Sequence, residues 1–126
     1  MRVCSLFSGI GGIDLGFIQA GFEIVWANEF DENAAKTYRH NFKNDNLVVK
    51  NIKKVNIDAI PDFDVLVAGF PCQPFSSIGM QKGFNDTRGT LFFEIVKVVA
   101  KKKPKVIFLE NVANLLGHDD GKTFLT

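Results

Sequence analysis

One cysteine lies between two prolines, where its thiol could act as a nucleophile. Pro71 and Pro74 flank Cys72 within the run Gly-Phe-Pro-Cys-Gln-Pro-Phe-Ser at 69–76. Prolines fix the local backbone and interrupt the hydrogen bonds of a strand, so the thiol is expected in a loop at the rim of a pocket. A free cysteine is more often a buried apolar residue, which is the better interpretation of Cys4. For Cys72 a reactive thiolate is the stronger hypothesis.

An acid follows a second apolar run and could work with this thiol. Glu110 comes directly after the strand-like segment 106–109 and precedes Asn111. Apolar neighbours would favour its neutral form, which could protonate a ring nitrogen while the thiolate adds to the ring. The alternative is an ordinary strand-end carboxylate that caps the next helix. The catalytic interpretation requires the strands before Cys72 and Glu110 to be adjacent.

A glycine-rich turn near the start of the chain indicates a small-molecule site. Gly9, Gly11 and Gly12 would let a ligand approach the backbone and the free amides of a helix start. The dinucleotide fingerprint would place a third glycine at position 14, but Asp14 stands there and suits a pyrophosphate poorly. Glu29, 20 residues after Gly9, could bind both hydroxyls of a ribose. S-adenosylmethionine, which has no phosphate, satisfies both observations.

Each of these features also has a purely structural interpretation. The segment 9–12 could form only a tight turn, and Glu29 could be a solvated charge at a strand end. Phe7 and Phe30 border the same crevice and could sandwich an adenine, but either could equally pack in the core. The site is therefore inferred from the set and not from any one residue.

The elements that must position these residues alternate between strands and helices. Strands are predicted at 2–7, 22–27, 47–49, 64–68 and 106–109, and helices at 13–20, from Asp31 to about 42, and at 91–103. Such alternation predicts an α/β fold with a doubly wound, mostly parallel sheet of about five strands. Binding residues should then gather at the carboxyl ends of the strands. The run 64–68, which has no polar alternation, should be an interior strand.

Composition indicates one domain over residues 1–126. Of these 126 residues 46% are hydrophobic, and 15 basic side chains nearly balance 14 acidic ones. This balance lacks the basic footprint of an autonomous nucleic-acid binder. No apolar run is long enough for a membrane span, and two cysteines make neither a disulfide framework nor a metal site. Asp119 and Asp120 look like the start of a helix that ends too soon at Thr126, so we expect a domain cut short.

Five ordered motifs resemble those of cytosine-5 DNA methyltransferases. They are Phe-Ser-Gly-Ile-Gly-Gly at 7–12, Asn-Glu-Phe-Asp at 28–31, the cysteine motif at 69–76, Asp-Thr-Arg-Gly-Thr-Leu-Phe-Phe at 86–93 and Glu-Asn-Val at 110–112. The resemblance runs from Val3 to the last residue. It implies a Rossmann-like methyltransferase fold that binds S-adenosylmethionine and acts on double-stranded DNA.

The resemblance also implies catalytic roles. Cys72 would attack carbon 6 of a cytosine flipped out of the duplex, Glu110 would protonate nitrogen 3, and carbon 5 would accept the methyl group. The segment 81–88 would close over the flipped base. Four further residues would shape the loop and the pocket: Pro71, Gln73, Ser76 and Asn111.

The cofactor contacts carry over with one departure. They are Phe7, Gly9, Ile10, Gly11, Gly12, Glu29, Phe30, Asn51, Ile52, Pro71 and Leu91. Where the family usually has an acid before an apolar residue to hold the adenine amino group, this chain has Asn51 and Ile52. An amide oxygen can accept the same bond without charge, so we expect somewhat weaker cofactor binding.

The family's later motifs, including an active-site arginine, and its target recognition domain have no counterpart here. We therefore expect a fragment or a split subunit that is inactive alone and needs a complementary chain. Such an enzyme would work in the cytoplasm, at the nucleoid in a bacterium, within a restriction-modification system.

Two alternatives stay open. A tRNA cytosine-5 methyltransferase would share the Pro-Cys-Gln motif, although Gly69 and Phe70 before it and Ser76 after it favour the DNA group. A non-catalytic module that only binds cofactor or a partner chain would also keep the fold, but the intact Cys72 and Glu110 speak against decay.

Overall fold

Strands and helices alternate along the whole described chain. The computed structural model describes residues 1–43, 46–70 and 91–111. The elements are β1 (Arg2–Leu6), α1 (Gly12–Gln19), β2 (Glu23–Glu29), α2 (Glu32–Asn41), β3 (Leu47–Val49), the short 3₁₀ helices η1 (Ile52–Lys54) and η2 (Ile57–Ala59), β4 (Val65–Gly69), α3 (Leu91–Lys102) and β5 (Val106–Glu110). Each predicted strand and helix is present within about two residues of its expected bounds.

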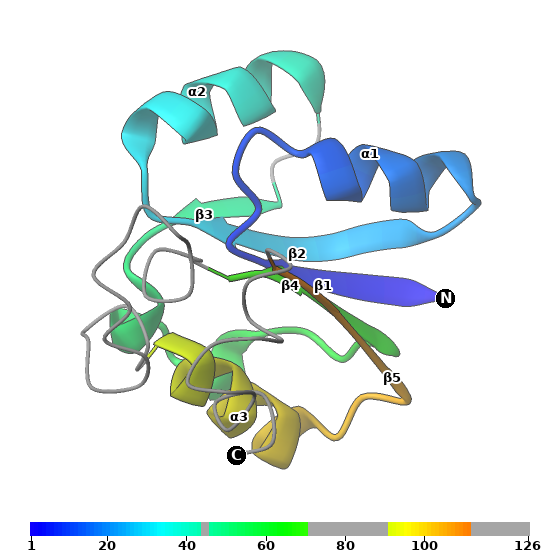
Figure 1. Cartoon of the computed structure of the whole chain (residues 1–126), viewed down its shortest axis with the longest axis vertical. Coiled ribbons are helices and arrows are strands. Elements are labelled where there is room, and N and C mark those ends of the chain that lie inside the picture. The colour runs from blue at the N-terminus through cyan, green and yellow to red at the C-terminus, as the bar shows by residue number, and fades with distance from the viewer. Residues whose placement is uncertain (44–45, 71–90, 112–126) are drawn as a thin grey trace, which may run out of the picture.

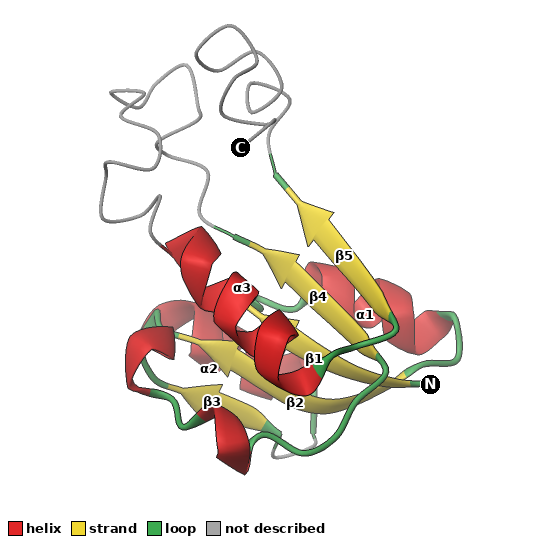
Figure 2. Ribbon diagram, turned by 90° about the horizontal axis from the view of Figure 1, so that it is seen from below, coloured by secondary structure: helices red, strands yellow, loops and turns green. Residues whose placement is uncertain are grey.

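The five strands form one parallel sheet in the order β3-β2-β1-β4-β5. The chain winds outward from β1 to β3 and then returns to the other side of β1, so the strand order reverses between β1 and β4. Helices α1 and α2 cover one face and α3 covers the other (Figures 1 and 2). The predicted doubly wound sheet is confirmed, and β4 is an interior strand as expected.

Two hydrophobic clusters, one on each face of the sheet, make up the core. Successive strand residues point to opposite faces, so Val3 belongs to the cluster that includes Tyr38 of α2, while Cys4 belongs to the cluster that includes Ile95 and Val98 of α3. Cys4 is fully buried, and this burial raises the pKa of its thiol. Its interpretation as an apolar core residue therefore stands.

Local capping explains where three elements begin. The Asp31 carboxylate accepts hydrogen bonds from the amides of Asn33 at 2.7 Å and Ala34 at 3.2 Å, which starts α2 as predicted. The two 3₁₀ helices were not predicted. Asn51 and Asn56 cap them, but each spans three residues, too few to show a helical period. Among the described residues, no helix is long and apolar enough to cross a membrane.

Candidate cofactor and catalytic site

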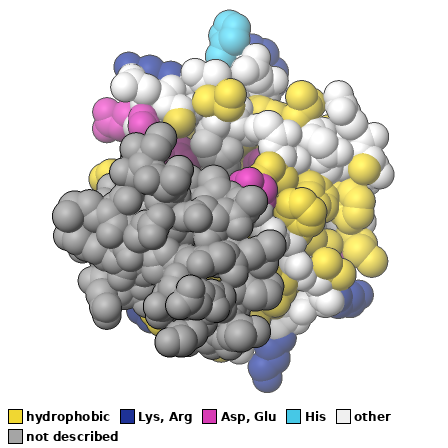
Figure 3. Space-filling model, viewed as in Figure 1, with side chains coloured by type: hydrophobic (Ala, Val, Ile, Leu, Met, Phe, Trp, Pro, Cys, Tyr) yellow, Lys and Arg dark blue, Asp and Glu magenta, His cyan; other side chains and the backbone are white. Residues whose placement is uncertain are grey.

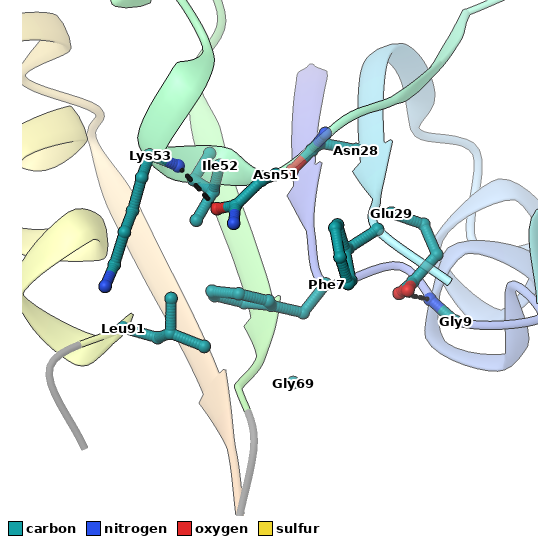
Figure 4. Close-up of a pocket in the computed structure, with 10 residues that line it drawn as sticks. Phe7, Gly9, Asn28, Glu29, Asn51, Ile52, Lys53, Gly69 and Leu91 are labelled. Carbon is teal, nitrogen blue, oxygen red and sulfur yellow. Dashed lines mark hydrogen bonds between the residues drawn. The ribbon is translucent and has the colours of Figure 1, made fainter. Parts of the chain in front are cut away.

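A pocket of about 580 Å³ opens at the carboxyl ends of the strands. Its size falls within the range of small-molecule sites. Its lining comes from segments that follow or end four different strands and from the start of α3 (Figure 4): Phe7, Gly9, Asn28, Glu29, Phe30, Asn51, Ile52, Lys53, Gly69 and Leu91. The pocket therefore lies where a doubly wound sheet is expected to bind a ligand.

The turn between β1 and α1 has an unusual backbone. Phe7, Gly9 and Gly11 have φ angles of 53°, 58° and 97°. Gly11 also has no room for a side chain, because an added Cβ would overlap the rings of Phe42 and Tyr38. At Phe7 the left-handed conformation is costly for a residue with a side chain, and its ring points into the pocket (Figure 4). The turn thus holds Phe7 in a conformation that residues with a side chain rarely adopt.

The Glu29 carboxylate is held in place by two backbone amides. Its Oε1 accepts a hydrogen bond from Gly9 N at 2.9 Å, and its Oε2 accepts one from Asp31 N at 2.7 Å. Each carboxylate oxygen can accept at least one more hydrogen bond. Glu29 thus joins the glycine turn to the start of α2 and offers two fixed acceptors at the pocket wall, as two neighbouring hydroxyls of a ribose require.

Asn51 lines the pocket with an oxygen that already has a partner. Its Oδ1 accepts a hydrogen bond from Lys53 N at 3.0 Å as the cap of η1 (Figure 4). One acceptor position of that oxygen stays available for an adenine amino group. Ile52 is buried next to it, so the short helix both positions Asn51 and anchors it in the core.

Seven of the predicted cofactor residues line this pocket: Phe7, Gly9, Glu29, Phe30, Asn51, Ile52 and Leu91. Ile10, Gly11 and Gly12 lie in the adjoining turn, outside the lining. Pro71 lies outside the described residues. The contacts of all these residues with a cofactor stay predictions.

Three residues of the lining were not predicted: Asn28, Lys53 and Gly69. Asn28 is buried, and its Nδ2 donates to the carbonyls of Val48 and Lys50 at 2.9 Å each. It thereby ties the end of β2 to the segment that leads to Asn51. An asparagine at the end of an apolar strand was the signal that could have indicated this role.

The strands that lead to the two predicted catalytic residues are adjacent. Gly69, at the end of β4, is the register partner of Glu110, at the end of β5. A Cβ added to Gly69 would lie 3.4 Å from Glu110 Oε2. Asn111 Nδ2 donates to the carbonyl of Phe70 at 3.2 Å, which links β5 to the start of the cysteine motif. The adjacency that the catalytic interpretation requires is therefore present.

The expected apolar enclosure of Glu110 is not found. Its side chain is exposed, because β5 is the outer strand of the described sheet.

Other predicted features lie outside the described residues, namely Cys72, Gln73, Ser76, the segment 81–88 and the expected helix start at 119–120. Among the residues that the structure does describe, no cluster of three or more His, Cys, Asp or Glu side chains could hold a metal.

The family model for the C-5 cytosine-specific DNA methylase matches residues 1–126. The chain belongs to this family. It is 57% identical over 126 residues to the type II methyltransferase M.Bsp6I of Bacillus sp. (strain RFL6). It is 50% identical over 123 residues to the type II methyltransferase M.HhaI of Haemophilus parahaemolyticus. Each match covers 98% of this chain but only 40% and 37%, respectively, of the relative.

Solved structures of methyltransferases share the fold. A protein described as a putative DNA modification methyltransferase encoded within a prophage (E. coli) superposes with a TM-score of 0.80 at 27% identity, over 99% of this chain and 36% of that one. The Dnmt2 methyltransferase of S. pombe gives 0.76 at 26% identity, over 99% and 40%. The predicted family and the Rossmann-like methyltransferase sheet are confirmed, and DNA cytosine methylation is the general activity of this family.

Proposed function

We propose that this chain is the cofactor-binding and catalytic portion of a DNA cytosine-5 methyltransferase that uses S-adenosylmethionine. The main support for this proposal is that the pocket and the predicted acid lie at the same edge of the sheet. The pocket that holds Glu29 and Asn51 includes Gly69 in its lining, and Gly69 is paired with Glu110. The cofactor and the acid would therefore both lie next to Gly69, which precedes Cys72 by three residues in the sequence.

The pocket suits an adenosine ligand without phosphates. Glu29 supplies two fixed acceptors for ribose hydroxyls, Asn51 supplies an acceptor for an adenine amino group, and Phe7 and Phe30 supply aromatic faces. Asp14, in the first turn of α1, stands where the dinucleotide fingerprint has its third glycine, so the turn lacks the pattern that binds a pyrophosphate. S-adenosylmethionine, when bound, supplies the methyl group that carbon 5 of cytosine receives.

The protein's own groups would make that carbon reactive. The Cys72 thiolate forms a bond to carbon 6 of the flipped cytosine, and Glu110 gives a proton to nitrogen 3, so carbon 5 becomes electron-rich. After methylation, carbon 5 loses its proton to solvent water and the bond from sulfur to carbon 6 breaks, while nitrogen 3 returns its proton to Glu110, which restores the ring, the acid and the thiolate. Extrusion of the base costs a few kcal/mol before these steps.

We further propose that a complementary polypeptide completes the site, because apolar side chains of β5 lie exposed. Val106, Ile107, Phe108 and Leu109 are 42–48% exposed. An apolar groove of about 380 Å³ runs beside them along α1, lined by Ile13, Gly16, Phe17, Ala20, Phe22, Phe108 and Glu110. Figure 3 shows hydrophobic side chains gathered on the side where α1 and β5 lie. Enclosure there would give Glu110 the apolar surroundings that general acid catalysis needs.

Cofactor titration into the purified chain by calorimetry tests the proposal. S-adenosylmethionine should bind and NAD should not, and Glu29→Gln should weaken binding about tenfold or more, because it removes charged acceptors. Glu32→Gln is the control, since Glu32 is exposed in the next helix. The chain alone should not methylate DNA. Preference for NAD, or methylation by the purified chain alone, would contradict the respective part of the proposal.

A further inference from the structure

A buried carboxylate lies directly behind the glycine turn and has no part in the chemistry proposed above. Asp14, in the first turn of α1, is 1% exposed. Its Oδ1 accepts a hydrogen bond from Ser5 Oγ at 2.6 Å, and its Oδ2 accepts one from Tyr38 Oη at 2.7 Å. Burial of a carboxylate is costly unless it is hydrogen-bonded, so both hydroxyls matter to the fold. The three residues come from β1, α1 and α2.

The same network reaches the turn through Ser8. Ser5 Oγ lies 3.0 Å from Ser8 Oγ, and Ser8 Oγ also lies within hydrogen-bond distance of the Ser5 carbonyl at 3.2 Å. The Ser8 carbonyl in turn accepts a hydrogen bond from Gly11 N at 3.0 Å. Asp14 is thus connected by a short chain of hydrogen bonds to the turn whose Gly9 lines the pocket.

Tyr38 contacts that turn with its ring as well as its hydroxyl. The ring lies close to Gly11, where an added Cβ would be 3.0 Å from it and would overlap Phe42, and it stacks on Phe42 with 4.5 Å between ring centroids. Helix α2, which carries Tyr38, begins just after Glu29 and Phe30, and it lies beside α1 on one face of the sheet (Figure 1). Two links therefore join the halves of the pocket: Glu29 with Gly9 at its wall, and Tyr38 with Asp14 behind it.

We propose that Asp14 and Tyr38 are a positioning pair that holds the glycine turn in the conformation that receives the cofactor. Neither residue lines the pocket, so both act on cofactor affinity through the turn and not by contact. This inference rests on the proposed use of S-adenosylmethionine. It predicts that loss of the Tyr38 hydroxyl alone, with the ring retained, weakens cofactor binding.

The test measures cofactor affinity and local order together in the purified chain. Tyr38→Phe and Ser5→Ala should each raise the Kd for S-adenosylmethionine about five- to twentyfold. Each variant loses a hydrogen bond to the Asp14 carboxylate, and only a part of that loss should reach the cofactor, because the turn transmits it. Amide exchange at Gly9 and Gly11 should become faster in the cofactor-free variants. Tyr38→Phe combined with Asp14→Asn should lose less than the sum of the single losses, as expected for a pair that acts as a unit.

Two controls separate positioning from general stability. Thr37→Val removes an exposed hydroxyl from α2, and Val98→Ala lowers stability from the opposite face of the sheet. Both should keep the parent affinity. Unchanged affinity in Tyr38→Phe and Ser5→Ala, or an equal loss in Val98→Ala, would overturn the inference while the parent still binds. Failure of the parent to bind S-adenosylmethionine would overturn the proposed function and the inference with it.

Discussion

Gly69 and Glu110 are partners across two parallel strands, with the acid at the end of one and the cysteine motif after the other. The Glu110 Oε2 lies so close to Gly69 that a side chain there would only just fit, at 3.4 Å. The acid and the segment that leads to Cys72 are therefore held at one point of the sheet edge.

Glu110→Gln should remove the general acid and keep the shape of the site. In a chimera that joins residues 1–126 to the remaining part of the Bacillus methyltransferase, methyl transfer should fall by about 10²- to 10⁴-fold. Cofactor affinity should stay at the parent value. Glu32→Gln serves as the control because Glu32 is an exposed acid of α2. Transfer at the parent rate in Glu110→Gln would remove the acid from the mechanism.

Asn51→Asp should strengthen cofactor binding. A carboxylate oxygen accepts a hydrogen bond more strongly than an amide oxygen does, so the Kd for S-adenosylmethionine should fall about fivefold. Asn56→Asp is a matched control, because Asn56 caps the next 3₁₀ helix in the same way and lies outside the cofactor pocket. Calorimetry compares the two. Unchanged or weaker binding in Asn51→Asp alone would count against the contact with adenine.

Gly11→Ala should destabilise the chain. The φ of Gly11 is 97°, and a Cβ there would overlap the rings of Phe42 and Tyr38, so the free energy of unfolding should fall by about 2 kcal/mol or more. Gly16→Ala in the helix that follows has open space around it and should be neutral or raise stability by about 0.5–1 kcal/mol. Urea unfolding measures both. Equal stability of the two variants would show that the turn adjusts freely.

Asp14 should make folding stability depend on pH with an unusual sign. Burial raises the pKa of its carboxyl, with hydrogen bonds from Ser5 and Tyr38 partly opposing the rise. Because its pKa is raised, Asp14 holds its proton more tightly in the folded chain than in the unfolded chain. This contribution to stability is complete at a pH below the pKa of the unfolded chain, and it is lost as the pH rises through the pKa of the folded chain. The free energy of unfolding of the parent, relative to Asp14→Asn, should therefore fall from acidic to neutral pH.

Asp64 provides the opposite case for the same urea experiment. A hydrogen bond from the Arg2 amide, assisted by the charges of Lys105 and Arg2, lowers the pKa of its carboxyl. The free energy of unfolding of the parent should therefore exceed that of Asp64→Asn at neutral pH, and this difference should disappear as the pH falls through the lowered pKa. Slopes of the same sign for Asp14 and Asp64 would contradict the prediction for Asp14.

Local pattern predicted most of the fold. The glycine turn and the motifs indicated seven residues that line the pocket, and their roles stay predictions. The apolar runs predicted the strands, and Asp31 predicted the start of α2. Both signals are local, because strand burial and helix capping depend on residues that are close in the sequence. The roles of Asn28 and Tyr38 were missed, because their partners lie on elements distant in sequence. The exposure of Glu110 depends on which strand is outermost, and residues 106–109 alone do not show that.

Covalent trapping shows whether Cys72 forms a bond to cytosine. Duplex DNA of mixed sequence that carries 5-fluorocytosine is incubated with the chimera and S-adenosylmethionine, and adducts that survive denaturation are resolved on a gel. The parent and Cys4→Ala should form an adduct, and Cys72→Ser should form none. The 126-residue chain alone should form no adduct. An adduct that persists in Cys72→Ser, or its formation only on an RNA that carries 5-fluorocytosine, would contradict a DNA methyltransferase with Cys72 as its nucleophile.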